Sequence, residues 1–375
     1  MNGDLVCFSH LRWDFVFQRP QHLMIRHGRH GQVLFVEEPR YGDEEEPRLV
    51  LSPAGNGVSV AVPHLRAGTS ETEAIRAQRE MLDALLASAR GSDPILWYYT
   101  PMALPFSEHL AASLVVYDCM DELAAFRGAP PALLDQERRL LQRTDVVFTG
   151  GWSLYEAKRH RHPNVHPVPS SVDAAHFARA REPQSEPADQ APIPRPRLGF
   201  AGVIDERMDL PLLAALADAR PGWHIVMVGP VVKIDPSELP RRPNIHYLGG
   251  KPYGELPAYL SGWDVALLPF ARNESTRFIS PTKTPEYLAA GRPVVSTSIR
   301  DVVRPYGEMG LVRIADDADA FARAVDAAMA EDGGSVAWRR RVDELLADMS
   351  WDRTWARMDG AMRDALRRRA RSKAG

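Results

Sequence analysis

The chain has 375 residues, of which 45% are hydrophobic and 25% charged, a composition typical of a folded globular protein with room for two domains. Its 46 basic and 49 acidic side chains give a net charge of -3, so no overall positive field would gather nucleic acid, which is not an expected partner. The two cysteines lie in apolar runs, and no run approaches the roughly 18 apolar residues that span a bilayer. We therefore expect a cytoplasmic protein, neither exported nor integral to a membrane.

Short β-rich runs alternate with amphipathic helical stretches along the first half of the chain. The predicted strands are "DLVCFS", "QVLFVE", "PILWYY", "LVVYDC", "DVVFTG" and "VHPVPS", with a helix over Glu71 to Ala89 among them. This alternation is typical of a doubly wound parallel sheet. It predicts a first Rossmann-like domain over residues 1–178.

The loop after the first predicted strand is rich in aromatic and polar side chains. It reads "FSHLRWDFVFQRPQHL" and ends in a helix with Pro20 in its first turn. Because loops at the carboxyl ends of parallel strands face the crevice of such folds, its polar residues can meet a substrate. We select Arg19 and His22 as catalytic candidates. The other interpretation is a well-packed loop whose aromatic rings belong to the core.

A second carboxyl-end loop carries acidic residues in "VVYDCMDE". A carboxylate at that edge can accept a proton from an acceptor hydroxyl, and we select Asp121 for this role. Aspartate is also a good helix cap, so a purely structural duty is the alternative.

A proline-dense segment without periodicity, residues 179–197, predicts an exposed linker. After it the alternation restarts with "RLGFAG", "WHIVMVG", "NIHYLGG", "DVALLPF" and "PVVST". This predicts a second Rossmann-like domain over residues 198–349. Residues 350–375 form a final helix, which begins at Ser350 as N-cap.

The stretch "ISPTKTPEYLAAGRPVVSTS" predicts a loop, a short helix beginning near Pro281, and a strand. Lys283 and Glu286 are three apart, so they share a face near the positive end of that helix. A lysine can hold a diphosphate, and a carboxylate one turn on can accept hydrogen bonds from a ribose diol. The pair therefore indicates a sugar nucleotide, while the alternative is an ordinary helix with a solvated Lys/Glu pair.

This stretch resembles the donor-site helix of retaining GT-B glycosyltransferases of family 4 (group 1). The matching residues are Pro281, Lys283, Glu286, Tyr287 to Ala289, Gly291 and Pro293 to Val295. "SSVDAAHF" independently resembles the segment by which that family leaves its first domain. The loop leading to "QRPQHL" is similar to that of bacterial surface-polysaccharide enzymes, the teichuronic-acid branch included. Many relatives carry a second glutamate eight positions before the first, where this chain has Phe278.

The resemblance implies two Rossmann-like domains facing across a cleft, with an acceptor domain first, a nucleotide-sugar donor domain second, and a closing helix that crosses back. It implies transfer of a hexosyl group from a nucleoside-diphosphate sugar to a hydroxyl of a lipid-linked or growing surface glycan. The implied donor-binding residues are Gly202, Arg207, Gly250, Tyr253, Thr282, Lys283 and Glu286. Arg207 could equally be a surface arginine, and Tyr253 could stack on a base or simply pack.

Transfer from a nucleotide sugar passes through an oxocarbenium-like state, so stabilising the departing diphosphate is the main work expected, without a cofactor or metal. The literal D-x-D at Asp317 to Asp319 opens a late helix and is better explained as charge complementing its dipole. Two rival functions stay open. A nucleotide-sugar epimerase would convert donor without acceptor, and a non-catalytic nucleotide-sugar-binding protein would release no nucleoside diphosphate.

The C-terminal tail is basic, with Arg363, Arg367, Arg368, Arg369, Arg371 and Lys373. Such a cluster can attract anionic lipid headgroups, at roughly 1 kcal/mol per basic residue. Peripheral contact with the membrane is therefore one expectation, and a solvated helix end is the other.

Overall fold

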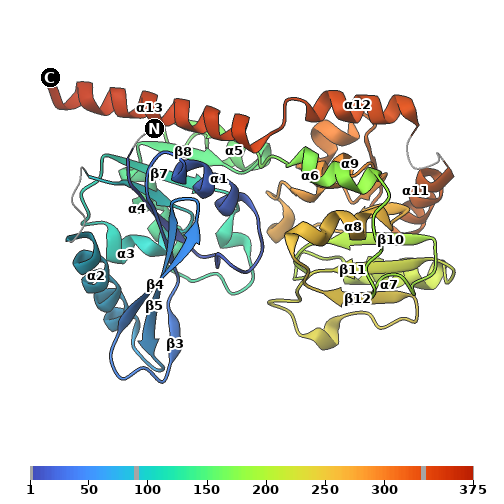
Figure 1. Ribbon diagram of the computed structural model, residues 1–375, viewed down its shortest axis with the longest axis horizontal. Coiled ribbons are helices and arrows are strands. Elements are labelled where there is room, and N and C mark those ends of the chain that lie inside the picture. The colour runs from blue at the N-terminus through green and yellow to red at the C-terminus, as the bar shows by residue number, and fades with distance from the viewer. Residues whose placement is uncertain (1–2, 88–92, 331–334, 375) are drawn as a thin grey trace.

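The computed structural model describes residues 3–87, 93–330 and 335–374, and within these residues the chain forms two α/β lobes, each built on its own sheet (Figure 1). The predicted architecture of two doubly wound sheets is confirmed, since every strand pairing but one is parallel. The exception is the antiparallel pair β4 and β5.

The first sheet has the strand order β3-β5-β2-β1-β6-β7-β8-β9, with β4 on β5. Its strands are β1 (Leu5–Ser9), β2 (Val33–Glu37), β3 (Arg40–Gly42), β4 (Arg48–Gly55), β5 (Val58–Arg66), β6 (Ile95–Tyr98), β7 (Leu114–Cys119), β8 (Val146–Thr149) and β9 (Val165–Pro167). The helices of this lobe are α1 (Arg19–Gly28), α2 (Glu71–Ala87), α3 (Leu104–Ser107), α4 (Leu133–Arg143) and α5 (Trp152–Lys158).

Alternate residues of these strands enter two different cores, as the two-residue period of a strand requires. Leu5 and Cys7 of β1 pack in the core that contains α1 and the C-terminal helix. Val6 and Phe8 pack in the opposite core, with residues of α2, α3 and α4. Both faces of β1 are therefore buried, which explains its continuous apolar sequence.

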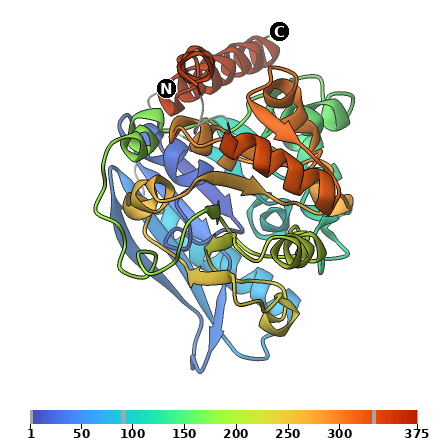
Figure 2. The same ribbon diagram turned by 90° about the vertical axis from the view of Figure 1, so that its right-hand side faces the viewer.

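The second sheet has the order β12-β11-β10-β13-β14-β15. Its strands are β10 (Arg197–Ala201), β11 (His224–Val228), β12 (Ile245–Gly249), β13 (Val265–Leu268), β14 (Val294–Ser296) and β15 (Val312–Ile314). The helices around it are α7 (Leu210–Ala219), α8 (Leu256–Ser261), α9 (Lys283–Ala289), α10 (Arg300–Val302), α11 (Ala318–Ala330) and α12 (Val336–Leu346). Figure 2 looks from the second-lobe end, with the first lobe behind.

Residues 179–197, predicted to form an exposed linker, are exposed or half-buried except for Ala180, Gln190, Ile193 and Arg197, which are buried. The second-lobe core already includes Val172 and Phe177, the latter in α6 (Ala174–Ala178), so the chain joins that lobe before residue 179. Gln190 is fully buried, donates to the Tyr259 carbonyl (3.1 Å) and accepts from the indole N–H of Trp263 (2.9 Å). Proline density marked the lack of regular structure here, but side-chain burial depends on the surface beneath it.

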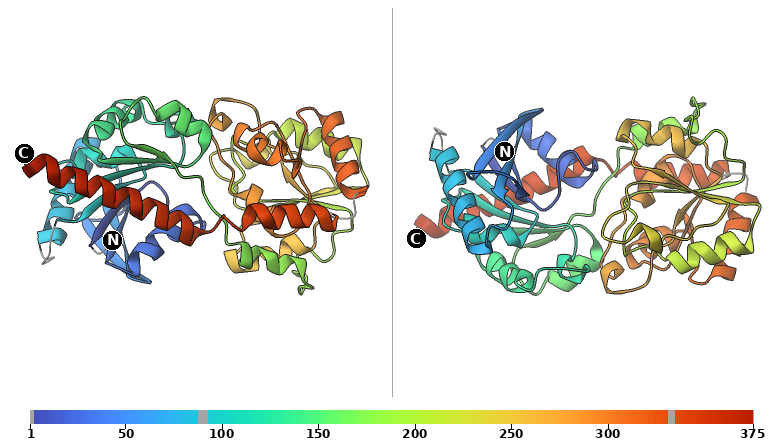
Figure 3. Two further views of the ribbon diagram at one scale, coloured as in Figure 1. Left: turned by 90° about the horizontal axis from the view of Figure 1, so that it is seen from above. Right: turned by 90° about the horizontal axis from the view of Figure 1, so that it is seen from below.

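The last helix, α13 (Trp351–Ala374), crosses from the second lobe and lies along the first (Figures 1 and 3). Its side chains Trp351, Trp355 and Met358 pack in the same core as α1. Arg26 of α1 adds an ion pair to Asp352 at 2.9 Å. Among the described residues, no helix combines the length and the apolar character that crossing a membrane requires.

Candidate functional site

A cavity of about 520 Å³ lies between the two lobes. The first lobe contributes residues 13–17 from the loop after β1, and the second contributes the ends of β10 and β11 together with the loop after β12. These are carboxyl ends of parallel strands, where ligands of doubly wound sheets bind. Lys283, Gly202, Gly250 and Tyr253, all predicted donor-binding residues, line this one cavity.

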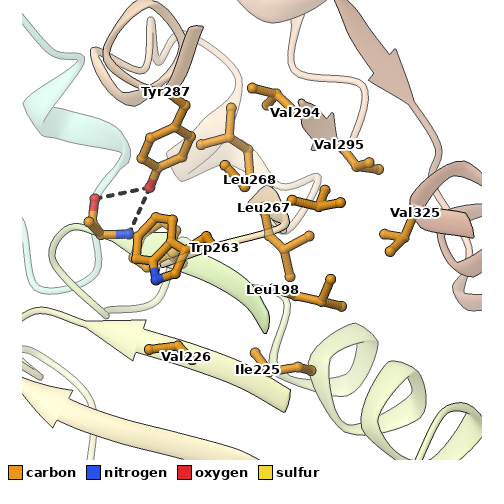
Figure 4. Close-up of a cluster of buried hydrophobic side chains, with 14 of the residues drawn as sticks. Leu198, Ile225, Val226, Trp263, Leu267, Leu268, Tyr287, Val294, Val295 and Val325 are labelled. Carbon is orange, nitrogen blue, oxygen red and sulfur yellow. Dashed lines mark hydrogen bonds between the residues drawn. The ribbon is translucent and has the colours of Figure 1, made fainter. Parts of the chain in front are cut away.

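Helix α9 is fixed against the end of β10 by the hydroxyl of Tyr287, as the dashed lines of Figure 4 show. The Ala201 N–H donates to this hydroxyl (2.7 Å), and the hydroxyl donates to the Ala201 carbonyl (3.2 Å). Trp263 lies beneath the same strand, where a Cβ on Gly199 would come within 1.8 Å of the indole. The first residue of α9, Lys283, is thereby held next to the turn that follows β10.

Lys283 and Glu286 form an ion pair with an Nζ to Oε2 distance of 3.0 Å, and their side chains are 18% and 11% exposed. Two glycines allow close packing in the turn beside the lysine. A Cβ on Gly202 would lie 3.3 Å from its Cε, and a Cβ on Gly229 would lie 1.8 Å from the Gly202 carbonyl oxygen. The helix begins at Lys283, two residues after the predicted start, and Thr282 precedes it without a side-chain cap bond.

Tyr253 packs against other rings. It stacks on His176 with ring centroids 4.3 Å apart and an angle of 10°, and it contacts Phe17 of the first lobe at 5.0 Å. Burial, followed by the charge of Glu286, raises the pKa of the Tyr253 phenol. Tyr253 thus packs against Phe17 and His176 and also lines the cavity, so both of its predicted roles stay open.

Arg207 lies in the turn after β10 and is held by Asp205. Its Nε and Nη2 reach the two carboxylate oxygens at 2.9 and 2.7 Å. The guanidinium also lies 5.5 Å from the ring centroid of Phe126 in the first lobe. Its charge is thus largely compensated before any ligand arrives.

Asp121, in the loop after β7, faces charges of the second lobe. Burial raises its carboxyl pKa to about 6, with Asp205 raising it further and Arg207 and Lys233 opposing the shift. A carboxylate with a pKa near neutrality is suited to general base chemistry. These neighbours could not be predicted from the sequence around Asp121, because they belong to the other lobe.

Residues 195–331 match the sequence profile of the family described as glycosyl transferases group 1. These residues form a group 1 glycosyl transferase domain. The chain is also 29% identical over 240 residues to TuaH of Bacillus subtilis (strain 168), provisionally named a teichuronic acid biosynthesis glycosyltransferase. That match covers 58% of this chain and 59% of TuaH, so it spans well under two thirds of the relative.

The solved structures extend the likeness to the whole fold. A trehalose-6-phosphate structure from E. coli, bound with UDP-2-fluoro glucose, superimposes with a TM-score of 0.68 at 15% identity and covers 97% of this chain and 99% of its own. An α,α-trehalose-phosphate synthase from Burkholderia xenovorans, in complex with glucose-6-phosphate, gives 0.70 at 10% identity and 97% and 100% coverage. Two parallel sheets arranged in this way are the GT-B fold, in which the group 1 domain is the second lobe.

Sequence reasoning missed Lys233, which follows β11 of the group 1 domain. Its backbone has a φ of 62°, and its ammonium lies 5.0 Å from the Phe126 ring centroid in the first lobe. Burial, followed by the charge of Lys233, lowers the pKa of His10 to about 4. The strand-end rule that selected Arg207 applies equally to this loop and could have found the lysine.

The geometry around Arg19 contradicts its predicted catalytic role. Its side chain is 1% exposed and forms a bidentate ion pair with the fully buried Asp118. The distances are 2.9 Å from Nε to Oδ2 and 2.8 Å from Nη2 to Oδ1. A third bond goes to the Val168 carbonyl at 2.8 Å. A guanidinium enclosed in this way has no surface for a substrate, so Arg19 holds α1 against β7 and is a positioning residue instead of a catalytic one.

The side chain of His22, the second catalytic candidate of the loop, is also mostly buried. The imidazole is 7% exposed and stacks on Trp351 of α13, with centroids 4.4 Å apart. Burial lowers its pKa to about 3, and the charges of Arg26, His176 and Lys283 add to the shift. The ring is therefore neutral at physiological pH, and the charge of Lys283 on the donor side contributes to that state.

Further contacts join the group 1 domain to the first lobe. Asp301 accepts from the backbone N–H groups of Trp152 (2.8 Å) and Ser153 (3.0 Å) at the start of α5. A Cβ on Gly151 would lie 2.3 Å from an Asp301 oxygen, which explains the glycine.

Phe278, where many relatives have glutamate, packs against a core of the first lobe. Among the described residues, no group of three potential ligands is placed to hold a metal.

Proposed function

We propose that this protein is a glycosyltransferase that moves a hexosyl group from a nucleoside-diphosphate sugar to a hydroxyl of a bacterial surface glycan. The observation that carries the proposal is the Lys283–Glu286 pair, held at 3.0 Å in the group 1 domain, whose lysine lines the cavity between the lobes together with Gly202. The E. coli structure of the same fold was solved with UDP-2-fluoro glucose, and TuaH carries a surface-polymer name.

In the proposed complex the diphosphate lies across Gly202 and accepts from Lys283, while the Glu286 carboxylate accepts from the ribose hydroxyls. The bond between the anomeric carbon and the diphosphate oxygen breaks, and the electron pair leaves with the diphosphate. Lys283 and Lys233 compensate the charge that develops there. No step is routed through a metal.

The acceptor oxygen then bonds to the anomeric carbon, and its proton passes to Asp121. The pKa of about 6 makes Asp121 ionised yet basic enough to take that proton at neutral pH. Phe17 and Tyr253 close one side of the cavity, which limits competing attack by water. The resemblance to retaining enzymes supports retention of anomeric configuration, with Phe278 replacing the family's sugar-binding glutamate.

The first test is a thermal-shift screen of nucleoside diphosphates and their sugars, since a ligand at about 100 times its Kd stabilises the native state by roughly 2.7 kcal/mol. The best donor is then incubated with lipid-linked glycan acceptors, and release of nucleoside diphosphate is measured. Release that depends on acceptor supports the proposal. Donor conversion without acceptor identifies an epimerase, and binding without release under every acceptor condition identifies a non-catalytic binding protein.

We also propose peripheral contact with anionic membrane through α13. Several of its arginines are already paired, Arg363 with Asp359 at 2.8 Å and Arg369 with Asp145 at 2.6 Å, so the attraction is weaker than the count of charges implies. The side chain of Lys373 lies outside the described residues. Cosedimentation with anionic vesicles should fall when residues 367–375 are deleted, and unchanged cosedimentation contradicts this contact.

A further inference from the structure

A second cavity, of about 420 Å³, lies within the first lobe. It is lined by the carboxyl ends of β1 and β2, by α2, and by the short helices after β6. Its volume is within the range of about 300–1,000 Å³ found for small-molecule sites. The cavity is separate from the donor-side cavity, because the two share no lining residue.

The floor of this cavity is apolar. Phe8, Val36 and Phe106 line it and are buried in the core behind it. Tyr41, also in the lining, leaves 54% of its surface exposed and so offers a ring face at the opening. Exposed aromatic faces beside an apolar floor suit the C–H face of a sugar ring or an apolar aglycone.

The polar groups of the cavity are acidic or neutral. Its lining, as far as the chain is described, includes Glu37, Glu38 and Glu71 and no lysine, arginine or histidine. Arg12, just outside, is occupied by Glu37 (2.9 Å) and by the carbonyls of Glu38 and Pro39. A phosphate in this cavity would therefore meet carboxylates with no cation of the lining to compensate it.

Gln78 supplies a hydrogen-bonding group inside the cavity. Its side chain is 8% exposed, and its amide N–H₂ donates to the Ala74 carbonyl at 3.0 Å. The remaining amide oxygen can accept a bond from a hydroxyl, as the Glu71 and Glu38 carboxylates also can. Acceptors without matching cations are the arrangement that recognises a polyol in preference to an anion.

This cavity adjoins the donor-side cavity. Glu37, in its lining, accepts from the Trp13 backbone N–H at 2.8 Å, and Trp13 lines the donor-side cavity. Burial raises the pKa of the Glu38 carboxyl, and the charges of Arg12 and then of Lys233 of the group 1 domain oppose that shift. The same lysine acts on Asp121, the proposed base. A molecule seated in the cavity with one hydroxyl directed past Glu37 would thus approach the donor-side cavity.

We infer that this cavity is the acceptor subsite and that it takes an uncharged glycoside, with phosphorylated sugars rejected by the lining glutamates. The inference rests on the proposed function, whose acceptor class it narrows. It sets this protein apart from its Burkholderia structural neighbour, which was solved with glucose-6-phosphate.

The test compares binding of p-nitrophenyl hexosides with binding of the 6-phosphates of the same p-nitrophenyl hexosides, by calorimetry on the full chain. We expect at least one neutral glycoside to bind, and the matching sugar phosphate to bind at least about tenfold more weakly. Ile75→Trp fills the cavity from α2 and should abolish glycoside binding. Ala84→Trp adds the same ring to an exposed position of α2 outside the cavity and should leave binding unchanged.

The variant Glu38→Gln/Glu71→Gln removes two of the repelling charges and should reduce the difference in Kd between the glycoside and the sugar phosphate. The inference is overturned if no glycoside binds, if the phosphate binds as well as the glycoside, or if Ile75→Trp binds like the parent. Folding of Ile75→Trp is checked by its thermal shift with the best nucleotide, which uses the other lobe. Failure of the proposed function shows differently, as absence of nucleotide binding or turnover in the parent protein.

Discussion

Replacing Lys283 by methionine keeps the apolar stem and removes the ammonium from the donor side of the cavity. In the folded protein the ammonium makes one partly buried ion pair, to Glu286 three residues along α9. Such a pair contributes about 0.2–0.5 kcal/mol, so the free energy of unfolding should change by less than about 1 kcal/mol. A charge-assisted hydrogen bond to a diphosphate is worth about 1.5–3 kcal/mol, which corresponds to about 10- to 150-fold in Kd.

Calorimetry with the best nucleoside diphosphate and urea unfolding measure these two quantities on the same variant. Lys251→Met is a matched control, because that lysine lines the same cavity with its ammonium bound by Asp189 at 2.6 Å. We expect the control to weaken nucleotide binding far less. The reasoning is refuted if Lys283→Met binds as the parent does, or if adding Glu286→Gln restores full affinity, since the lysine would then serve only to neutralise its neighbour.

Three further predictions address the base, the scaffold and the contact between the lobes. Asp121→Asn should slow turnover by about 10²–10⁴-fold and abolish the rise in rate as pH increases through about 6; an unchanged pH profile contradicts the assignment. Burial raises this carboxyl pKa from its ordinary 3.8 to about 6, so the ionised carboxylate destabilises the folded state as the pH rises above 3.8. The asparagine variant should therefore also have a higher melting temperature at neutral pH. Arg19→Met leaves Asp118 buried without its partner and should cost about 3–5 kcal/mol in urea unfolding; a loss below about 1 kcal/mol would show that the pair is not structural. Asp301→Ala removes two bonds between the lobes, so the radius of gyration from X-ray scattering should increase, and an unchanged radius would mean that other contacts set the closure.

Local sequence patterns were enough to predict the two sheets and the donor-side turn. The apolar runs of β1 and β10 identify strands buried on both faces, and the spacing of Lys283 and Glu286 places them on one side of α9. These features depend on neighbours within a few residues, which the sequence displays directly.

Features set by distant parts of the chain could not be predicted in the same way. Arg19 had the appearance of a loop cation near the cleft, but Asp118, 99 residues further on, holds it inside the protein. Gln190 sits in a proline-dense segment and is buried only because Tyr259 and Trp263 offer it partners. Asp121 owes its raised pKa to burial and to Asp205 of the other lobe, which no spacing rule indicates.

The central claim is that the second lobe holds a nucleoside diphosphate between Lys283 and Glu286, and a crystal structure with the best-binding nucleotide tests it most directly. We predict diphosphate density within hydrogen-bonding distance, about 2.7–3.2 Å, of the Lys283 ammonium, and ribose hydroxyls at the Glu286 carboxylate. A nucleotide bound elsewhere, or one in this cavity that leaves the pair at its present 3.0 Å without touching either side chain, would contradict the account.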